Sequence, residues 1–222
     1  MVVNWKNIDT VLLDMDGTLL DLHFDNYFWL THLPRRYAQQ FHRKEASVKK
    51  MIHTRLLEER GTLNWYSTDF WSTEFNIDIV ALKREIKHLI TKRPKTSRFL
   101  ENLAIAGKQR VLVTNADHNG MQIKFTQTQI DLEVDRVISS HDYGYPKEQR
   151  AFWDHLRKEI DFDPNRTAFI DDSILVLRAA QDYGIRYLFC IAQPDSQMRE
   201  NVDPDFFAIR DFDQLFDGFS RG

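Results

Sequence analysis

The sequence contains a single cysteine, Cys190, among its 222 residues. A lone cysteine excludes a disulfide bond within the chain. Cys190 lies in the apolar run 187–191, and such a setting favours burial in the core over redox chemistry. We therefore expect it to be a packing residue.

The sequence also lacks a hydrophobic run long enough to cross a membrane. Residues 1–10 have neither the basic start nor the apolar stretch of a signal peptide. The net charge is only −3, with basic residues interspersed among acidic ones, so nothing indicates a nucleic-acid-binding surface. Repeats and low-complexity segments are absent as well. With 42% hydrophobic residues the chain should be globular, and we expect a cytoplasmic protein with no membrane or nucleic-acid partner.

A buried strand followed by two carboxylates opens the chain. The run 11–13 is apolar throughout, which is typical of a strand covered on both faces in a parallel sheet. Asp14 and Asp16 follow it, and Gly17 favours a turn. Ligand sites of open α/β sheets lie at this end of the strands, so both carboxylates can meet one ligand. The plainer interpretation is an acidic turn in solvent, although adjacent carboxylates usually need a cation or a shared proton.

Residues 21–93 show helical spacing and no strand-like run. Asp25 is the expected N-cap of a first helix, which Pro34 should bend or end. Apolar residues that recur every three or four positions predict three more helices, around 48–56, 65–71 and 79–90. We therefore predict a small helical bundle inserted after the first strand, and we call residues 21–93 the insert.

Strands alternate with helices in the rest of the chain. Further strands are expected at 110–115, 136–139, 167–172 and 187–192. Helices are expected at 98–106, 120–129, 148–160 and 173–183, with a short helix in the tail after Gln193. This alternation predicts an α/β fold with a parallel, Rossmann-like sheet and helices on both faces. Residues 1–20 and 94–222 would form this core domain, and the insert a second, helical domain.

Polar residues follow four strand regions in a fixed order: Asp14 and Asp16, then Thr114-Asn115, the loop Tyr143–Lys147, and Asp171-Asp172-Ser173. This order resembles the four motifs of the haloacid dehalogenase superfamily of phosphohydrolases, and the insert resembles its C1-type cap. Longer segments are similar to the bacterial GMP/IMP nucleotidases of that superfamily; they are 11–22, 24–29, 62–66, 107–110, 144–148 and 169–173.

The resemblance implies a role for each motif residue. Asp14 would be the nucleophile that attacks phosphorus, and Asp16 would protonate the leaving oxygen and later activate water. Lys147 would offset the negative charge of nucleophile and phosphate. The phosphate would be held by Met15, Asp16, Thr114, Asn115 and Lys147. Taken singly, Thr114 and Asn115 are also typical of a strand-end cap, and Lys147 of a solvated surface.

The acidic residues also imply a metal ion. Carboxylate oxygens beside a phosphate favour Mg²⁺. The resemblance implies that Asp14, Asp172 and the backbone carbonyl of Asp16 bind it, with Asp171 acting directly or through water. Ser173 is a candidate cap for the next helix.

The insert carries the candidates for substrate choice, which are His23, Phe24, Asn26, Tyr27, Trp65 and Tyr66. Aromatic residues at helical spacing are mostly core residues, so we expect only a minority of these to touch substrate. His118 either flanks the leaving group or is a solvated loop residue.

The sequence therefore predicts a Mg²⁺-dependent phosphomonoesterase that hydrolyses the purine nucleotides GMP and IMP through an aspartyl-phosphate intermediate. A phosphatase for sugar phosphates or other small metabolites, a phosphomutase, and a phosphate-binding protein without catalysis are the alternatives. Haloacid dehalogenation is disfavoured, because that chemistry needs neither a leaving-group acid nor a metal.

Overall fold

A computed structural model describes residues 3–200 and 202–218, and a parallel sheet forms its centre. The strand order is β3-β2-β1-β4-β5-β6, the order of the Rossmann fold. The sequence predicted all of these strands except β6. Their bounds are β1 (Thr10–Leu13), β2 (Gln109–Thr114), β3 (Arg136–Ser139), β4 (Thr167–Asp171), β5 (Tyr187–Ile191) and β6 (Phe207–Ile209).

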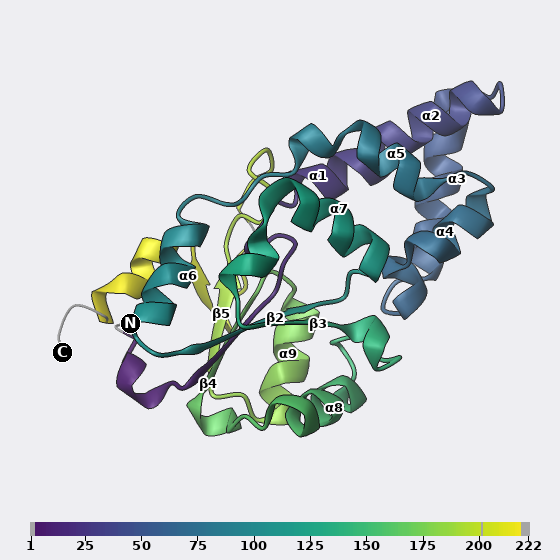
Figure 1. The fold of residues 1–222 in the computed structure, drawn as a ribbon. Coiled ribbons are helices and arrows are strands. Elements are labelled where there is room, and N and C mark those ends of the chain that lie inside the picture. The colour runs from purple at the N-terminus through teal and green to yellow at the C-terminus, as the bar shows by residue number, and fades with distance from the viewer. Residues whose placement is uncertain (1–2, 201, 219–222) are drawn as a thin grey trace.

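Helices cover both faces of the sheet, as predicted. Side chains alternate along each strand, so Leu13 faces one hydrophobic cluster and Leu12 faces the other. The first cluster includes residues of α6 (Thr96–Ile105) and α7 (His118–Thr128). The second includes residues of α8 (Arg150–Ile160) and α9 (Ile174–Tyr183), which Figure 1 shows together on one side of the sheet. Cys190 is buried in this second cluster.

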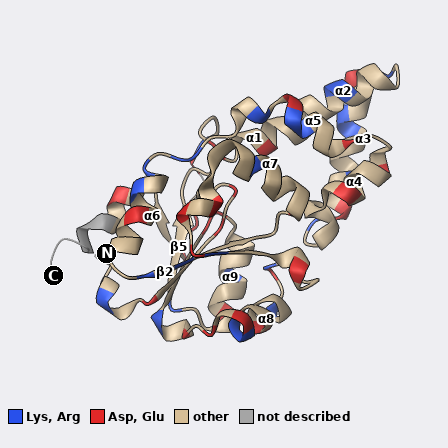
Figure 2. Cartoon of the chain, in the orientation of Figure 1, with Lys and Arg blue, Asp and Glu red and all other residues tan. Residues whose placement is uncertain are grey.

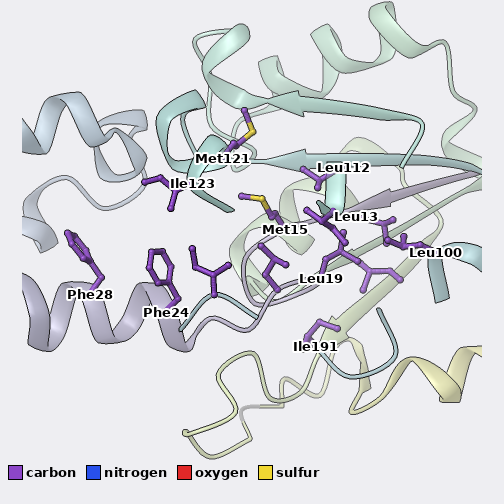
Figure 3. Packing of buried hydrophobic residues seen from close by; sticks show 14 of the residues in the cluster. Leu13, Met15, Leu19, Phe24, Phe28, Leu100, Leu112, Met121, Ile123 and Ile191 are labelled. Carbon is purple, nitrogen blue, oxygen red and sulfur yellow. The ribbon is translucent and has the colours of Figure 1, made fainter. Parts of the chain in front are cut away.

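The insert, every residue of which the structure describes, contains five α-helices at the end of the molecule away from the two termini (Figure 1). They are α1 (His23–Tyr27), α2 (Leu33–Gln40), α3 (Glu45–Glu58), α4 (Thr68–Phe75) and α5 (Ile79–Glu85). Figure 3 shows that Phe24 and Phe28 of this region continue the apolar cluster of Leu13 and Met15, with Ile123 of α7 nearby. One hydrophobic core therefore runs from the sheet into the insert.

Two local predictions for the first helix concern Pro34, which was expected to bend or end it, and Asp25, which was expected to cap it. Pro34 does not end it, because a π-helical turn at Phe28–His32 joins α1 directly to α2. A proline clashes with the carbonyl four positions before it and donates no hydrogen bond, and the wider turn accommodates both effects. Asp25 is not the N-cap either; Leu22 holds that position, and the Asp25 side chain is engaged in ion pairs.

Short 3₁₀ turns account for the remaining differences. Trp65 belongs to a separate turn, Leu63–Tyr66, and the predicted fourth helix is split into α5 and the turn Lys87–Leu89. The tail contains the unpredicted strand β6 and then the expected short helix, a 3₁₀ helix at Phe212–Gly218. Its Phe212 ring stacks on Phe99, so the tail does pack on the core.

Acidic and basic residues are both spread over the elements of the fold (Figure 2). Acidic and basic residues occur on helices of the insert and on helices beside the sheet (Figure 2). Within residues 3–200 and 202–218, no helix combines the length and hydrophobicity needed to cross a membrane.

Trp153 of α8 connects this packing to the loop after β3. Its buried indole N–H donates to the carbonyl of Lys147 at 2.8 Å, and its ring packs edge-on against Phe169. Trp153→Phe should lower the free energy of unfolding by about 1–3 kcal/mol, because the buried carbonyl loses its donor. Urea denaturation measures this change. Tyr183→Phe is the matched control, since it keeps the ring that packs on Trp153; equal midpoints for both variants would contradict the prediction.

Candidate active site

Three carboxylates converge where β1 and β4 end. Asp14 directly follows β1, and Asp171 and Asp172 stand at the end of β4. The two strands are parallel neighbours with Leu13 opposite Ile170, so the next residues of both lie side by side. One oxygen from each carboxylate lies within 4.8 Å of the others. This is the point at which the strand order reverses, where open α/β sheets bind ligands.

Lys147 is buried against this cluster, with only 2% of its surface exposed. Its Nζ donates to Asp14 Oδ1 at 2.5 Å, to Asp171 Oδ2 at 2.8 Å and to the carbonyl of Val113 at 3.1 Å. Its backbone N–H donates to Asn115 Oδ1 at 2.9 Å. The loop after β3 therefore delivers a fixed positive charge between two carboxylates, and the alternative of a solvated surface lysine is wrong.

Negative charge remains in excess at this site. Burial raises the pKa of Asp14 to about 7, and the Asp171 carboxylate adds to this effect although Lys147 opposes it. Burial and the charges of Asp171 and Asp14 likewise raise the pKa of Asp172 well above its usual range. One ammonium group faces three carboxylates, so an additional cation would relieve their repulsion.

The donor set fits a hard divalent cation such as Mg²⁺. All three side chains offer oxygen, the ligand that Mg²⁺ prefers. Lys147 donates to one oxygen of Asp14 and one of Asp171, and the other oxygen of Asp171 accepts from the Ser173 N–H at 2.7 Å. Gly17 packs directly against Asp172, since a Cβ at position 17 would lie 2.6 Å from Asp172 Oδ2. The turn after β1 thus confines the Asp172 carboxylate.

Asp16 lies beside the cluster in a different setting. It accepts a hydrogen bond from Lys124 Nζ at 2.5 Å, through its Oδ2 atom. Burial raises its pKa to about 6, although the ammonium group of Lys124 lowers it. Lys124 was not predicted; the only sequence signal is its place between the apolar residues Ile123 and Phe125.

The remaining motif residues line the site or are buried beneath it. Thr114 and Asn115 line the cavity described below; Thr114 Oγ1 accepts from the N–H of Ala116 at 3.0 Å. Met15 is fully buried, so only its backbone can reach a ligand. His118 has 69% of its side chain exposed and pairs with Asp142, which fits the solvated alternative.

A cavity of about 280 Å³ joins the carboxylates to the insert. The insert contributes aromatic and polar side chains to its wall, and among them are Asn26, Trp29, Trp65, Tyr66 and Thr68. Three of the six predicted specificity residues are therefore present: Asn26, Trp65 and Tyr66. Trp29 and Thr68 were not predicted, because the spacing of aromatic residues and threonines along a helix does not show which of them line a cavity.

The other three predicted specificity residues do not line this cavity. Phe24 is only 1% exposed, and its ring lies beneath the ammonium groups of Lys83 and Lys124. His23 pairs with Asp195 at 3.4 Å, and its ring contacts Tyr27.

Hydrogen bonds fasten the insert to the part of the chain that forms the sheet, at the cavity rim. Asp117 Oδ2 accepts from both the N–H and the hydroxyl of Thr68 at 2.6 Å, while its Oδ1 caps α7. The Tyr66 hydroxyl donates to Glu148 at 2.8 Å, and Glu148 also accepts from the Asn115 amide. These contacts were not predicted. The only signals in the sequence are Asp117, shortly after Thr114-Asn115, and Glu148, directly after Lys147. They enclose the cavity over the carboxylate cluster.

Comparison with known proteins gives consistent results. A family model described as haloacid dehalogenase-like hydrolase matches residues 8–184. The GMP/IMP nucleotidase YrfG of Escherichia coli (strain K12) is 38% identical over 213 residues, which cover 96% of both chains. The structure of a HAD phosphatase from Thermococcus onnurineus aligns with a TM-score of 0.80 at 19% identity, over 96% of this chain and 98% of that one. The HAD-hydrolase YfnB from Bacillus subtilis, bound to magnesium, aligns with a TM-score of 0.64 at 18% identity, over 96% and 99%.

Gly17→Ala should disturb the site more than the fold. The Cβ would displace Asp172, whereas Gly184, which also has a positive φ, has open space where a methyl group would stand. Both variants should lose about 1 kcal/mol of stability from backbone strain. Only Gly17→Ala should weaken divalent-cation binding, by about tenfold, as measured by isothermal titration with Mg²⁺. Equal cation affinities in the two variants would contradict this role for Gly17.

Proposed function

The chain belongs to the haloacid dehalogenase-like hydrolase family, and we propose that it is a Mg²⁺-dependent phosphatase for purine nucleoside 5′-monophosphates, above all GMP and IMP. The observation that carries the proposal is a buried cluster of Asp14, Asp171 and Lys147 that opens into a cavity walled by aromatic residues. The nucleotidase relative, which aligns along nearly the whole chain, supports the choice of substrate.

In the proposed first step, a carboxylate oxygen of Asp14 attacks phosphorus and the bond from phosphorus to the 5′ oxygen breaks. Asp16 gives its proton to that oxygen, which releases the nucleoside and leaves a phosphoryl group on Asp14. Asp16, now ionised, then takes a proton from a water molecule. That water attacks phosphorus, frees inorganic phosphate and restores the Asp14 carboxylate.

The other motif residues hold the phosphoryl group during both steps. Lys147 already contacts Asp14 and would offset the charge that gathers on the phosphate oxygens. The backbone amides of Met15 and Asp16 and the polar groups of Thr114 and Asn115 would bind the same oxygens. Such donors are effective because their orientation is fixed before the reaction begins.

Asp14, Asp172 and the backbone carbonyl of Asp16 would hold Mg²⁺, with Asp171 binding directly or through water. When bound, the ion would supply positive charge that balances the carboxylates and the substrate phosphate.

The insert would act as the cap that selects the substrate, with residues 21–93 as cap domain and residues 1–20 and 94–222 as core domain. Residues 1–2, 201 and 219–222 of that core lie outside the described part of the chain. Trp65 and Trp29, which line the cavity, would stack on a base, and Asn26 and Tyr66 would offer polar groups to it. The cytoplasmic location of the enzyme stays a prediction.

Asp14→Asn should abolish phosphate release while the fold survives. The amide keeps the shape and can still accept a hydrogen bond from Lys147, but it cannot attack phosphorus. We expect turnover of GMP to fall by at least about a thousandfold. Phosphate release measures this, with mass spectrometry to exclude deamidation and circular dichroism to verify folding. A folded variant that keeps most of the wild-type rate would show that Asp14 is not the nucleophile.

A panel of phosphorylated metabolites tests the substrate. With Mg²⁺ present, GMP and IMP should be hydrolysed with higher kcat/KM than pyrimidine nucleotides or sugar phosphates, and EDTA should silence all turnover. Trp65→Ala should lower kcat/KM for GMP by about tenfold, since stacking a base on an aromatic ring contributes about 1–3 kcal/mol. The fold should tolerate this change, because Trp71 bonds to the backbone carbonyl of Trp65 and not to its side chain.

The small aryl ester 4-nitrophenyl phosphate is the control for Trp65→Ala, because it does not carry a purine. Its kcat/KM should change less than about threefold. A sugar phosphate preferred over GMP by tenfold or more would replace the nucleotidase proposal by that of a sugar-phosphate phosphatase.

A further inference from the structure

We propose that Lys124 is a positioning residue for Asp16, and that Asp25 and Lys83 of the insert hold Lys124 in place. This inference rests on the proposed function, because it takes Asp16 as the acid that protonates the leaving group. It adds three charged residues, none of them in the sequence motifs, to the machinery of the site.

The four side chains form an unbroken row of alternating charge. Lys124 Nζ donates to Asp16 Oδ2 at 2.5 Å and to Asp25 Oδ2 at 2.8 Å. The other oxygen of Asp25 accepts from Lys83 Nζ at 2.7 Å. All four residues line the cavity. The row begins after β1, passes through α7 of the sheet domain, and ends in α1 and α5 of the insert.

Burial makes this row unlike a surface ion-pair network. Lys124 and Lys83 are 3% and 5% exposed, and the Phe24 ring lies beneath both ammonium groups. Burial alone would raise the pKa of Asp25, but the two ammonium groups hold it well below its usual range. Buried ion pairs rarely stabilise a fold more than apolar residues of the same volume would. A stability role therefore does not explain why the row extends from the insert to Asp16.

The geometry gives the row of charges a different role, which is to constrain the carboxylate of Asp16. Lys124 holds the Oδ2 atom of Asp16, and Oδ1 accepts no hydrogen bond from any described residue. Oδ1 is thus the oxygen that remains to exchange a proton with the leaving group and with water. Asp25 restrains Lys124 from the far side, and Lys83 balances the charge of Asp25. Correct placement of the acid therefore depends on the insert being seated on the sheet domain.

The test compares two substrates that differ in their need for an acid. The 5′ oxygen of GMP must be protonated as it leaves, whereas 4-nitrophenolate leaves without a proton. Lys124→Met should lower kcat for GMP by about tenfold or more, while kcat for 4-nitrophenyl phosphate falls less than about threefold. Lys124→Arg should restore most of the GMP rate, because it keeps the positive charge. The paired variant Asp25→Asn/Lys83→Met leaves the contact between Asp16 and Lys124 intact, and should give a smaller loss confined to GMP.

Arg55→Met is the matched control. It removes ion pairs with Glu58, Glu59 and Glu74 in the insert, and none of these residues lines the cavity, so both substrates should keep their rates. Equal losses on both substrates in folded Lys124→Met, or no loss on either, would overturn the proposal. A raised KM for GMP with unchanged kcat would also overturn it, by showing that Lys124 binds substrate instead.

Two other possible results, a variant that does not fold and a failure of the proposed function itself, can be told apart from a failure of this proposal. If Lys124→Met does not fold, the same comparison for Asp25→Asn/Lys83→Met decides the question. If wild-type enzyme does not release phosphate from GMP, or if Asp16→Asn slows both substrates equally, the proposed function itself fails, independently of Lys124.

Discussion

The ammonium group of Lys147 is the interaction on which the candidate site depends. Three carboxylates lie within 4.8 Å of one another in a buried space, and they would repel one another without a compensating charge. Lys147 contacts Asp14 and Asp171, and Asn115 fixes its backbone. The charge that Lys147 leaves unbalanced makes a divalent cation a fitting partner. Packing and charge are therefore properties of one arrangement, and the proposed metal binding rests on the same arrangement.

The parallel sheet explains why this arrangement arises at one place. β1 and β4 are covered on both faces, so their interiors hold apolar side chains and polar groups can stand only at their ends. Because the strands are parallel neighbours, those ends meet at the same edge. β2 adds the Val113 carbonyl and Asn115 from the other side of β1. Polar and charged groups gather at this edge because the buried interiors of the strands hold only apolar side chains.

This logic also sets what the sequence can predict. Asp14 and the Asp171-Asp172 pair could be located because they stand at the ends of recognisable strands that pair with each other, and Lys147 because it ends the Tyr143–Lys147 loop after β3. Lys124 and Asp25 could not, because their contact joins two helices 99 positions apart, and nothing in their local sequences encodes it. Locally, Asp25 is an equally good helix cap. Phe24 was one of the candidates for substrate contact for a related reason, since the two lysines above its ring are visible only in the folded chain.

The two proposed catalytic carboxylates differ in what fixes them. Among the basic groups that the structure describes, Lys147 of the sheet domain holds Asp14, so its placement needs no contribution from the insert. Asp16 is held by Lys124, whose second partner, Asp25, belongs to the insert. The proposed nucleophile is therefore held by residues outside the insert, whereas the proposed acid is held in place only where the insert meets the rest of the chain. An insert that is not seated would leave phosphoryl transfer from good leaving groups intact, while alkyl esters such as nucleotides would require the closed arrangement. In the proposed mechanism, substrate selection and proton transfer thereby depend on the same contact.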